Sequence, residues 1–271
     1  MWTRTAGNLH SRVGGYECLT SGLPIFNPGL TASGVVMRSQ LSSYYTLSEA
    51  AAADRIESTV GFYLSPTGTV SQVTGKLTNA AKTTGAGTAG SAVLAYFIQP
   101  LGQTLITSSN TISAWCWVQV DALPSLAAQG SRLLSITNGT DQFFAYVDLN
   151  GANGRFFVDG KAGATSLTAA EFTTLDISLA TEYFVQMYYD GSTGTLGINV
   201  NNGTWVTSTQ GASTPFTASG TDVLTVLSNG PAASAEQIRM DNLGFSDQLM
   251  TSANWDWLYN SDSGRLYAEY G

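Results

Sequence analysis

The sequence contains few cysteines, histidines and charged residues, and each shortage excludes a class of site. Cys18 and Cys116 are the only cysteines among 271 residues, too few for a disulfide framework or a zinc cluster. His10 is the only histidine and lies in the N-terminal segment, which argues against a Ser-His-Asp triad. Cys116 lies on the same face of a predicted strand as Ala114 and Val118, which are apolar. We therefore expect it to be a small buried side chain.

Closely spaced carboxylates of the kind that hydrolyse glycosides are also missing. Many glycosidases place alternate acidic side chains of one strand in the same groove, so that one carboxyl acts as the nucleophile and another as the acid. No two glutamates of this chain are two or four residues apart; they are Glu17, Glu49, Glu57, Glu171, Glu182, Glu236 and Glu269. We therefore expect no enzymatic activity.

The sequence has neither a basic excess nor a long apolar run. Its formal net charge is −8, whereas binding to nucleic acid or to an anionic membrane depends on a basic face. No apolar run approaches the ~20 residues that span a bilayer. Residues 1–15 also lack the apolar centre of a secretory signal. We expect no nucleic-acid partner, no membrane insertion and synthesis in the cytoplasm.

Glycine and small polar residues are abundant, and they punctuate short apolar runs. Asx-Gly pairs supply the positive φ angles of tight hairpin turns, and we expect such turns at Asn138-Gly139, Asn150-Gly151, Asp159-Gly160, Asp190-Gly191, Asn202-Gly203 and Asn229-Gly230. The runs near these pairs predict strands over 132–137, 142–149, 155–159, 182–190, 195–200, 204–208 and 223–227. One turn of helix is expected at 48–55, and a short helix at 252–259 capped by Thr251 or Ser252. The pattern predicts an all-β sandwich of two antiparallel sheets.

Several segments carry a resemblance to a known family. They are LSSYYTLSEAAAADRIESTVG at 41–61, TISAWCWVQVD at 111–121, EYFVQMYYDG at 182–191, and the C-terminal stretch 240–250 with Trp255 and Leu258-Tyr259-Asn260. Together they resemble the concanavalin A-like jelly rolls of the laminin G type. The resemblance covers residues 41–271 and implies one two-sheet jelly-roll domain over that range. It does not specify the function, because lectins, hydrolases and structural modules share this fold.

Members of this family often hold a calcium ion at the edge of the sandwich, with aspartate and backbone oxygens as ligands. Asp241 occupies the position of the family's strand acid, and Asp54 and Glu57 lie in the matching opening turn. The resemblance therefore implies a calcium site at Asp54 and Asp241, and no other cofactor. The alternative is that these carboxylates cap a strand or accept hydrogen bonds in a turn.

Residues 1–40 differ from the rest of the chain and show no clear periodicity. They contain five glycines between Gly7 and Gly29 and two prolines, together with scattered apolar side chains: Trp2, Leu9, Tyr16, Ile25 and Phe26. Ordering such a segment costs about 1–2 kcal/mol of backbone entropy per residue, so contacts are needed along its length. We expect either an extended arm that docks on partner proteins through these side chains, or an edge strand and loops of the same sandwich.

Aromatic side chains recur on individual strand faces. Trp115 and Trp117 share one face of their strand, Phe144 and Tyr146 share another, and Tyr189 lies on a third strand. Rings on the concave face of a jelly roll can stack on pyranose rings, so we interpret Trp115, Trp117, Tyr146 and Tyr189 as candidate glycan-binding residues. The alternative is that these rings fill the core of the sandwich.

These features together indicate a structural protein. An N-terminal arm followed by a jelly roll without a catalytic set looks like the structural and adhesive proteins of tailed bacteriophage particles. We expect a virion protein, either a capsid decoration or a fibre subunit, that is made in the host cytoplasm and forms homo-oligomers. Its arm would dock on capsid or tail proteins, and many copies would turn weak adhesion to host glycans into avidity. The alternative is a free carbohydrate-binding, lectin-like module.

Overall fold

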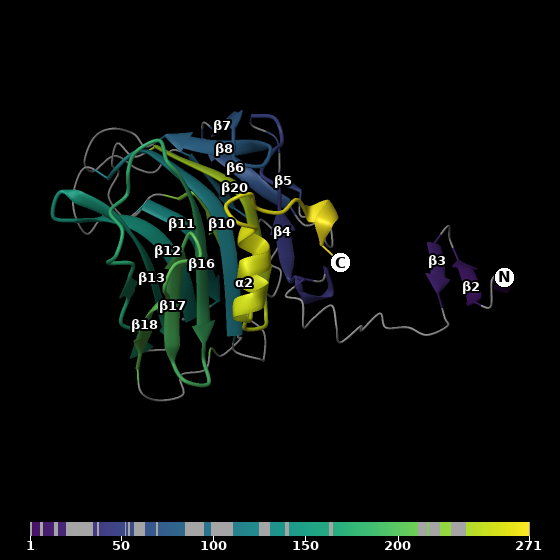
Figure 1. Ribbon diagram of the computed structural model, residues 1–271. Coiled ribbons are helices and arrows are strands. Elements are labelled where there is room, and N and C mark those ends of the chain that lie inside the picture. The colour runs from purple at the N-terminus through teal and green to yellow at the C-terminus, as the bar shows by residue number, and fades with distance from the viewer. Residues whose placement is uncertain are drawn as a thin grey trace.

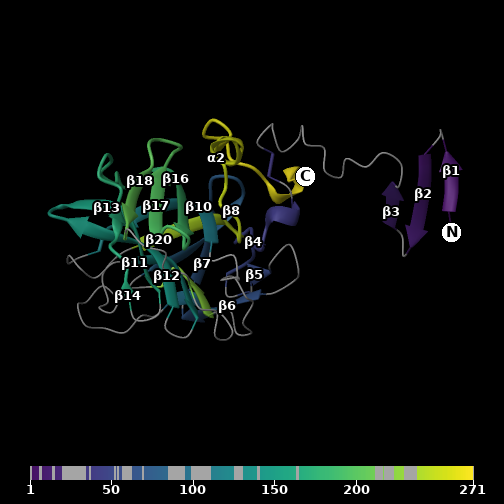
Figure 2. The same cartoon turned by 90° about the horizontal axis from the view of Figure 1, so that it is seen from below.

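The computed structural model of the chain is shown in Figure 1. It describes residues 2–5, 8–13, 16–19, 35–36, 38–51, 53, 55–56, 63–68, 70–84, 95–98, 111–124, 131–138, 141–162, 165–210, 216, 223–228 and 237–270. Most of these residues lie in two antiparallel sheets, seen from a second direction in Figure 2.

The first sheet has eight strands in the order β18-β17-β16-β10-β20-β8-β7, and β4 also pairs with β20. All of its described pairings are antiparallel. Its strands are β4 (Ser43–Tyr45), β7 (Val70–Thr74), β8 (Asn79–Thr84), β10 (Thr111–Ala122), β16 (Glu182–Asp190), β17 (Thr195–Val200), β18 (Val206–Thr209) and β20 (Gln237–Ser246).

The second sheet has nine strands in the order β14-β13-β12-β11-β19-β9-β6-β5, and β15 pairs with β13. Its strands are β5 (Arg55–Ile56), β6 (Tyr63–Gly68), β9 (Ala95–Ile98), β11 (Ser131–Asn138), β12 (Asp141–Asn150), β13 (Asn153–Ala162), β14 (Thr165–Ser166), β15 (Ala170–Glu171) and β19 (Val223–Val226). The two sheets confirm the predicted all-β, two-sheet antiparallel sandwich.

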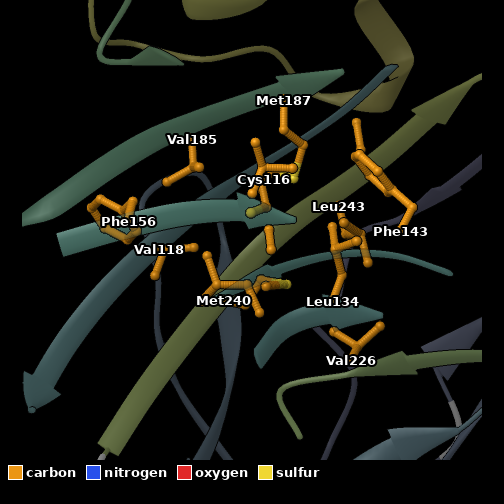
Figure 3. Close-up of a cluster of buried hydrophobic side chains, with 14 of the residues drawn as sticks. Cys116, Val118, Leu134, Phe143, Phe156, Val185, Met187, Val226, Met240 and Leu243 are labelled. Carbon is orange, nitrogen blue, oxygen red and sulfur yellow. The ribbon is translucent and has the colours of Figure 1, made fainter. Parts of the chain in front are cut away.

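The main hydrophobic core lies between the two sheets (Figure 3). Side chains alternate along each strand, so Phe143 and Val147 of β12 are buried and belong to the same cluster as Cys116 and Val118 of β10. Cys116 is fully buried, which confirms the prediction of a small core side chain. Each fully buried apolar side chain contributes about 1.5–3 kcal/mol, so this core supplies most of the stabilisation.

A second hydrophobic cluster lies on the outer face of the eight-stranded sheet. Trp115 and Trp117 of β10 point away from the main core and are only 2% and 3% exposed. Helix α2 (Ser252–Tyr259) lies over this face, and Trp255 meets Trp115 edge-on with the ring centroids 6.1 Å apart. Gly244 makes room for the Trp115 ring, since a Cβ there would lie 2.3 Å from its Cζ2 atom. Strand β10 is therefore buried on both faces.

Helix α2 begins and ends where the sequence predicts. The Thr251 hydroxyl accepts a hydrogen bond from the Asn254 N–H (3.2 Å), and the Asn254 side chain accepts one from the Thr251 N–H (3.0 Å), which is a capping box. Asn260 ends the helix in the left-handed conformation, with φ of 50°.

The described chain also contains two short 3₁₀ helices, η1 (Arg38–Gln40) and η2 (Tyr267–Glu269). No helix among the described residues is long and apolar enough to cross a membrane.

The turn predictions hold at most of the described positions. Tight turns follow β12, β16 and β17 as predicted, at Asn150-Gly151, Asp190-Gly191 and Asn202-Gly203. The helical turn predicted at 48–55 is not helical in its described residues, which contain a single hydrogen-bonded turn from the Ala53 N–H to the Ala50 carbonyl (3.1 Å) before β5 begins at Arg55. The turn predicted at Asp159-Gly160 is wrong, because both residues lie within β13. A Cβ on Gly160 would lie 2.9 Å from the Gln142 carbonyl oxygen, so this glycine permits a close approach of neighbouring backbone. Gly139 and the pair at 229–230 lie outside the described residues.

The N-terminal segment contains secondary structure that its sequence did not predict. Strands β1 (Trp2–Thr5), β2 (Asn8–Val13) and β3 (Tyr16–Leu19) form a three-stranded antiparallel sheet of their own. Among the described pairings, none joins these strands to the sandwich, and both views place them apart from it (Figures 1 and 2). Trp2, Leu9 and Tyr16 each lie on one of the three strands, whereas Ile25 and Phe26 lie outside the described residues. Val36, further along, already belongs to the second hydrophobic cluster.

The burial of Trp117 predicts a large effect on stability. Its ring lies 5.1 Å from that of Phe184 and 6.1 Å from that of Tyr259, measured between centroids. We expect Trp117→Ala to lower the free energy of unfolding by about 3–5 kcal/mol in urea denaturation, because the cavity cannot be refilled. Leu179→Ala is the control, since this side chain is 52% exposed. Equal effects of the two substitutions would contradict the assigned burial.

Candidate functional site

The outer face of the nine-stranded sheet carries three aromatic side chains on neighbouring strands. Phe144 and Tyr146 alternate with the buried residues of β12, and Phe157 does the same on β13. All three are partly exposed and belong to neither hydrophobic cluster. Because large rings are normally placed inside a sandwich, a group of them on an outer face is a candidate binding surface.

The strand register brings these rings into contact. Tyr146 and Phe157 are directly opposite across the β12–β13 pair. Their rings are nearly parallel, with 9° between the planes and 5.0 Å between the centroids. Phe144 lies 5.7 Å from Tyr146 at an angle of 34°. The three rings therefore form one contiguous apolar surface, which we call the aromatic face.

Two opposite charges flank Phe144 on this face. The Arg132 guanidinium of β11 lies over the Phe144 ring, with Cζ 4.8 Å from the centroid. Asp159 of β13 is the direct cross-strand partner of Phe144 on the other side. The Asp159 carboxylate accepts a hydrogen bond from the Gly160 N–H at 2.6 Å. A donor group and an acceptor group thus lie on either side of an aromatic ring.

Among the residues that the structure describes, Arg132 uses little of its hydrogen-bonding capacity. Its Nη1 donates one long hydrogen bond, 3.5 Å, to the Ser135 hydroxyl. In the part of the chain that the structure describes, Arg132 forms no salt bridge. Arg155 on the neighbouring strand differs, because it pairs with Glu171 at 2.7 Å and with Asp176 at 3.0 Å. Among the described residues, Arg132 is therefore the arginine of this face that has no carboxylate at salt-bridge distance.

Partial burial shifts the pKa of both charged groups, Arg132 and Asp159. Burial lowers the pKa of Arg132, although the charge of Asp159 opposes the change. Burial raises the pKa of Asp159, while the Gly160 N–H and the charge of Arg132 act against it. Burial also raises the pKa of Tyr146, and the charges of Asp159, Asp148 and Glu171 act in the same direction. Both charged groups have lost part of their hydration, which strengthens any hydrogen bond that a ligand makes with them.

The sequence-predicted glycan residues divide into two groups. Tyr146 lies on the aromatic face, and Phe144 shares it, as their common strand face suggested. The structure places the other three candidates in packed interiors, where their rings have no free face for a sugar. Trp115 and Trp117 lie under α2, and Tyr189 is in the main core with its ring 4.3 Å from Phe216. These three rings pack in the hydrophobic interior, which is the alternative stated from the sequence.

Three residues of the face were not singled out from the sequence: Arg132, Phe157 and Asp159. The sequence contains enough information to place Phe157 and Asp159 on this face. The Asn150-Gly151 turn fixes the register of the β12–β13 hairpin, and counting back from it places Phe157 opposite Tyr146 and Asp159 opposite Phe144. Arg132 could not be found in this way, because the pairing of β11 with β12 contains a register shift between Arg132 and Leu134.

Asp241, one of the two predicted calcium ligands, has a structural role in the turn that joins β7 to β8. Its carboxylate accepts hydrogen bonds from the N–H groups of Leu77 (2.8 Å) and Thr78 (3.3 Å), which is the alternative noted from the sequence. Gly75 allows this approach, since a Cβ there would lie 2.7 Å from Asp241 Oδ2. Asp54 lies outside the described residues. Within the described ranges, no three His, Cys, Asp or Glu side chains are grouped so as to hold a metal ion.

Comparison with solved structures supports the fold assignment. Botulinum neurotoxin type C, for which cell entry is described as dependent upon interaction with two ganglioside molecules, matches with a TM-score of 0.61 and 11% identity, over 83% of this chain and 52% of that chain. The binding domain of Paraclostridial Mosquitocidal Protein 1 matches with a TM-score of 0.56 and 11% identity, over 83% and 53%. Domain 4 of an extracellular arabinanase from Geobacillus stearothermophilus, in complex with arabinotriose, matches with a TM-score of 0.53 and 15% identity, over 83% and 98%.

These similarities show a β-sandwich fold, consistent with the concanavalin A-like resemblance. At such low identity they show the fold alone. The chain spans about half the length of the two toxin chains that it matches. No protein-family model and no curated protein matches the sequence.

The buried Asp241 predicts a pH-dependent contribution to stability. Burial raises its pKa from 3.8 to about 6, reinforced by the charge of Glu182 and opposed by the N–H groups of Leu77 and Thr78. Because the folded-state pKa lies above the unfolded one, the contribution is complete below about pH 4 and is lost as the pH rises through 6. Between pH 4 and 7, wild type should therefore lose on the order of 2–3 kcal/mol relative to Asp241→Asn in urea denaturation. A constant difference between the two proteins would contradict this assignment.

Proposed function

We propose that the chain is a non-catalytic saccharide-binding module and that the aromatic face is its binding surface. The observation that carries this proposal is the contiguous set of partly exposed rings with the Arg132 guanidinium over Phe144 and the Asp159 carboxylate on its other side. The C–H bonds on one face of a sugar ring carry partial positive charge and are attracted to the negative face of an aromatic ring. The flanking charges then bind the hydroxyl groups.

The arrangement of charge favours a neutral saccharide. An anionic ligand would be attracted by Arg132 but repelled by Asp159, and a cationic ligand would meet the reverse. A sugar hydroxyl both donates and accepts hydrogen bonds, so neighbouring hydroxyls satisfy the carboxylate and the guanidinium together. The net charge of −8 also disfavours a polyanion as the main ligand.

The fold supports the same class of function. The arabinanase domain that shares this fold was solved with arabinotriose, and botulinum neurotoxin type C interacts with gangliosides. Binding of this kind needs no catalytic group. An aromatic and polar surface of a rigid sheet is sufficient, because the strands fix the positions of the side chains before the ligand arrives.

Tyr146 provides the first test of the aromatic face. We expect Tyr146→Ala to weaken binding of neutral oligosaccharides about tenfold, the effect of losing roughly 1.4 kcal/mol of stacking. Tyr146→Phe should bind nearly as well as wild type, because the ring is kept. Tyr63→Ala on β6 is the matched control, since this tyrosine is 36% exposed on the same sheet.

A glycan array followed by isothermal titration calorimetry would make this measurement. Binding by wild type that Tyr146→Ala and Tyr63→Ala leave equally intact would exclude the aromatic face. Binding of acidic glycans alone would contradict the neutral class of ligand.

A virion role is a second proposal, favoured by the N-terminal sheet. Strands β1–β3 pair with one another rather than with the sandwich, as a separate attachment element would. In this proposal the segment 1–40 docks on capsid or tail proteins of a phage particle, and the homo-oligomeric sandwich 41–271 is displayed for adhesion to host glycans. Multiple copies would raise the avidity for a surface that one site binds weakly.

Removal of residues 1–22 tests this second proposal. The deletion takes away all three N-terminal strands and leaves the sandwich intact, so the melting temperature of the sandwich should stay within a few degrees of wild type. Particle attachment, followed by co-sedimentation of the chain with purified particles after a high-salt wash, should be lost. Full occupancy by the shortened chain would rule out docking through this segment.

A further inference from the structure

A groove of about 440 Å³ lies on the opposite side of the sandwich from the aromatic face. It runs along the outer surface of the eight-stranded sheet, between the segment that leads into α2 and the strands β16–β18. Its lining includes Tyr188, Trp205, Leu249 and Asp190. The volume is within the range of small-molecule sites, and Tyr188, Leu249 and Asp190 belong neither to the two hydrophobic clusters nor to the aromatic face.

The Tyr188 ring lies flat on the sheet within this groove. Tyr188 and Gly197 are direct cross-strand partners of β16 and β17. A Cβ on Gly197 would lie 2.2 Å from Tyr188 Cε1 and 2.5 Å from Cζ, so the ring occupies the space where a side chain would otherwise stand. Glycine in the middle of a strand weakens it. Here the glycine lets the tyrosine cover the neighbouring strand and turn one ring face toward the groove.

Two tryptophans extend this apolar surface. Trp205, which precedes β18, is partly exposed, and its ring centroid lies 5.0 Å from that of Tyr188. Trp205 also contacts Trp255 of α2 at 5.5 Å, which ties the groove to the packed cluster below the helix. Leu249 completes this side and is 43% exposed. The aromatic positions are therefore fixed by the fold rather than by a ligand.

A row of hydroxyl groups and a carboxylate borders the apolar surface. The Thr193 hydroxyl donates to Asp190 Oδ2 at 2.9 Å and lies 2.8 Å from the Thr195 hydroxyl. The Ser192 N–H and hydroxyl bind Asp190 Oδ1. Burial alone would raise the pKa of Asp190, but these hydrogen bonds outweigh it and lower the pKa. The carboxylate is thus charged and held in place beside the rings.

We propose that this groove is a second saccharide-binding site, in which a short neutral saccharide places a ring face on Tyr188 and its hydroxyls on the Asp190 and Thr195 border. The proposal rests on the proposed function only for the class of ligand. A small organic cation would also be attracted to rings and a carboxylate. It would fill a minor part of 440 Å³ and leave the threonine hydroxyls unused, which favours the saccharide.

The two sites face away from each other, because they lie on the outer surfaces of different sheets. One short oligosaccharide cannot reach both of them. The module would therefore hold two separate glycan chains, or two distant parts of one polysaccharide. Such a protein joins polysaccharide strands and does not only adhere to them.

Calorimetric titration with arabinotriose, xylotriose and maltotriose tests the groove in the full chain. Two substitutions address it without touching the aromatic face. Gly197→Ala keeps every ligand-contacting group but displaces the Tyr188 ring, and Trp205→Ala removes part of the wall. Each should weaken the groove site at least tenfold, with the fold checked by circular dichroism. Should one variant fail to fold, the other still carries the test.

The affinities of the two sites distinguish the two proposals. Wild type should bind two equivalents of at least one trisaccharide, Tyr146→Ala should weaken one of the two sites about tenfold, Gly197→Ala should weaken the other at least tenfold, and the double variant should weaken both. Loss of all binding in Tyr146→Ala alone, with the groove variants unchanged, would overturn the groove and leave the aromatic face. The reverse pattern would support the groove and overturn the aromatic face. No binding by wild type at millimolar trisaccharide, or binding of tetramethylammonium alone, would overturn the groove as a saccharide site.

Discussion

The burial of strand β10 on both faces is the constraint on which the rest of the structure depends. An antiparallel sheet commonly packs one face on the core and leaves the other in water. Here Cys116 and its neighbours fill the space between the sheets, while Trp115 and Trp117 need a second cover on the other side. Helix α2 supplies that cover through Trp255 and Leu258. Because the helix has only eight residues, its cover ends beside β16–β18, and the groove lies at that border.

The two outer surfaces are chemically different. On the nine-stranded sheet, Arg155 is neutralised by two carboxylates, whereas the half-buried Arg132 forms no salt bridge within the described chain. Leaving a desolvated cation unpaired costs stability. Proteins commonly retain such a cost where a group is needed for function. On the eight-stranded sheet Gly197 has a comparable role, since it gives up strand propensity so that Tyr188 can lie flat. The half-buried Arg132 and the strand residue Gly197 each reduce stability locally, and each lies at a candidate binding surface.

The sequence was sufficient for the sandwich but only partly for its surfaces. Alternating runs and Asx-Gly turns predicted the hairpins, and the Asn150-Gly151 turn even fixes which residue stands opposite Tyr146. Alternation along a strand separates two faces, but it cannot tell which of them a distant segment will cover. Trp115, Trp117 and Tyr146 therefore looked alike, although the C-terminal helix buries the first two. Strands β1–β3 were missed because four to six residues are too few to establish a period among glycines.

Because Cys116 is completely buried, the reactivity of its thiol reports on opening of the sandwich. The thiolate is the form that reacts with alkylating reagents, and burial raises the pKa of this thiol far above neutrality. A reagent can reach the sulfur only when the two sheets separate. The modification rate of this one atom, followed by peptide mass, would measure how often the core opens under native conditions. Ligands on the outer surfaces that slow this rate would do so by holding the sheets together, without ever approaching the thiol.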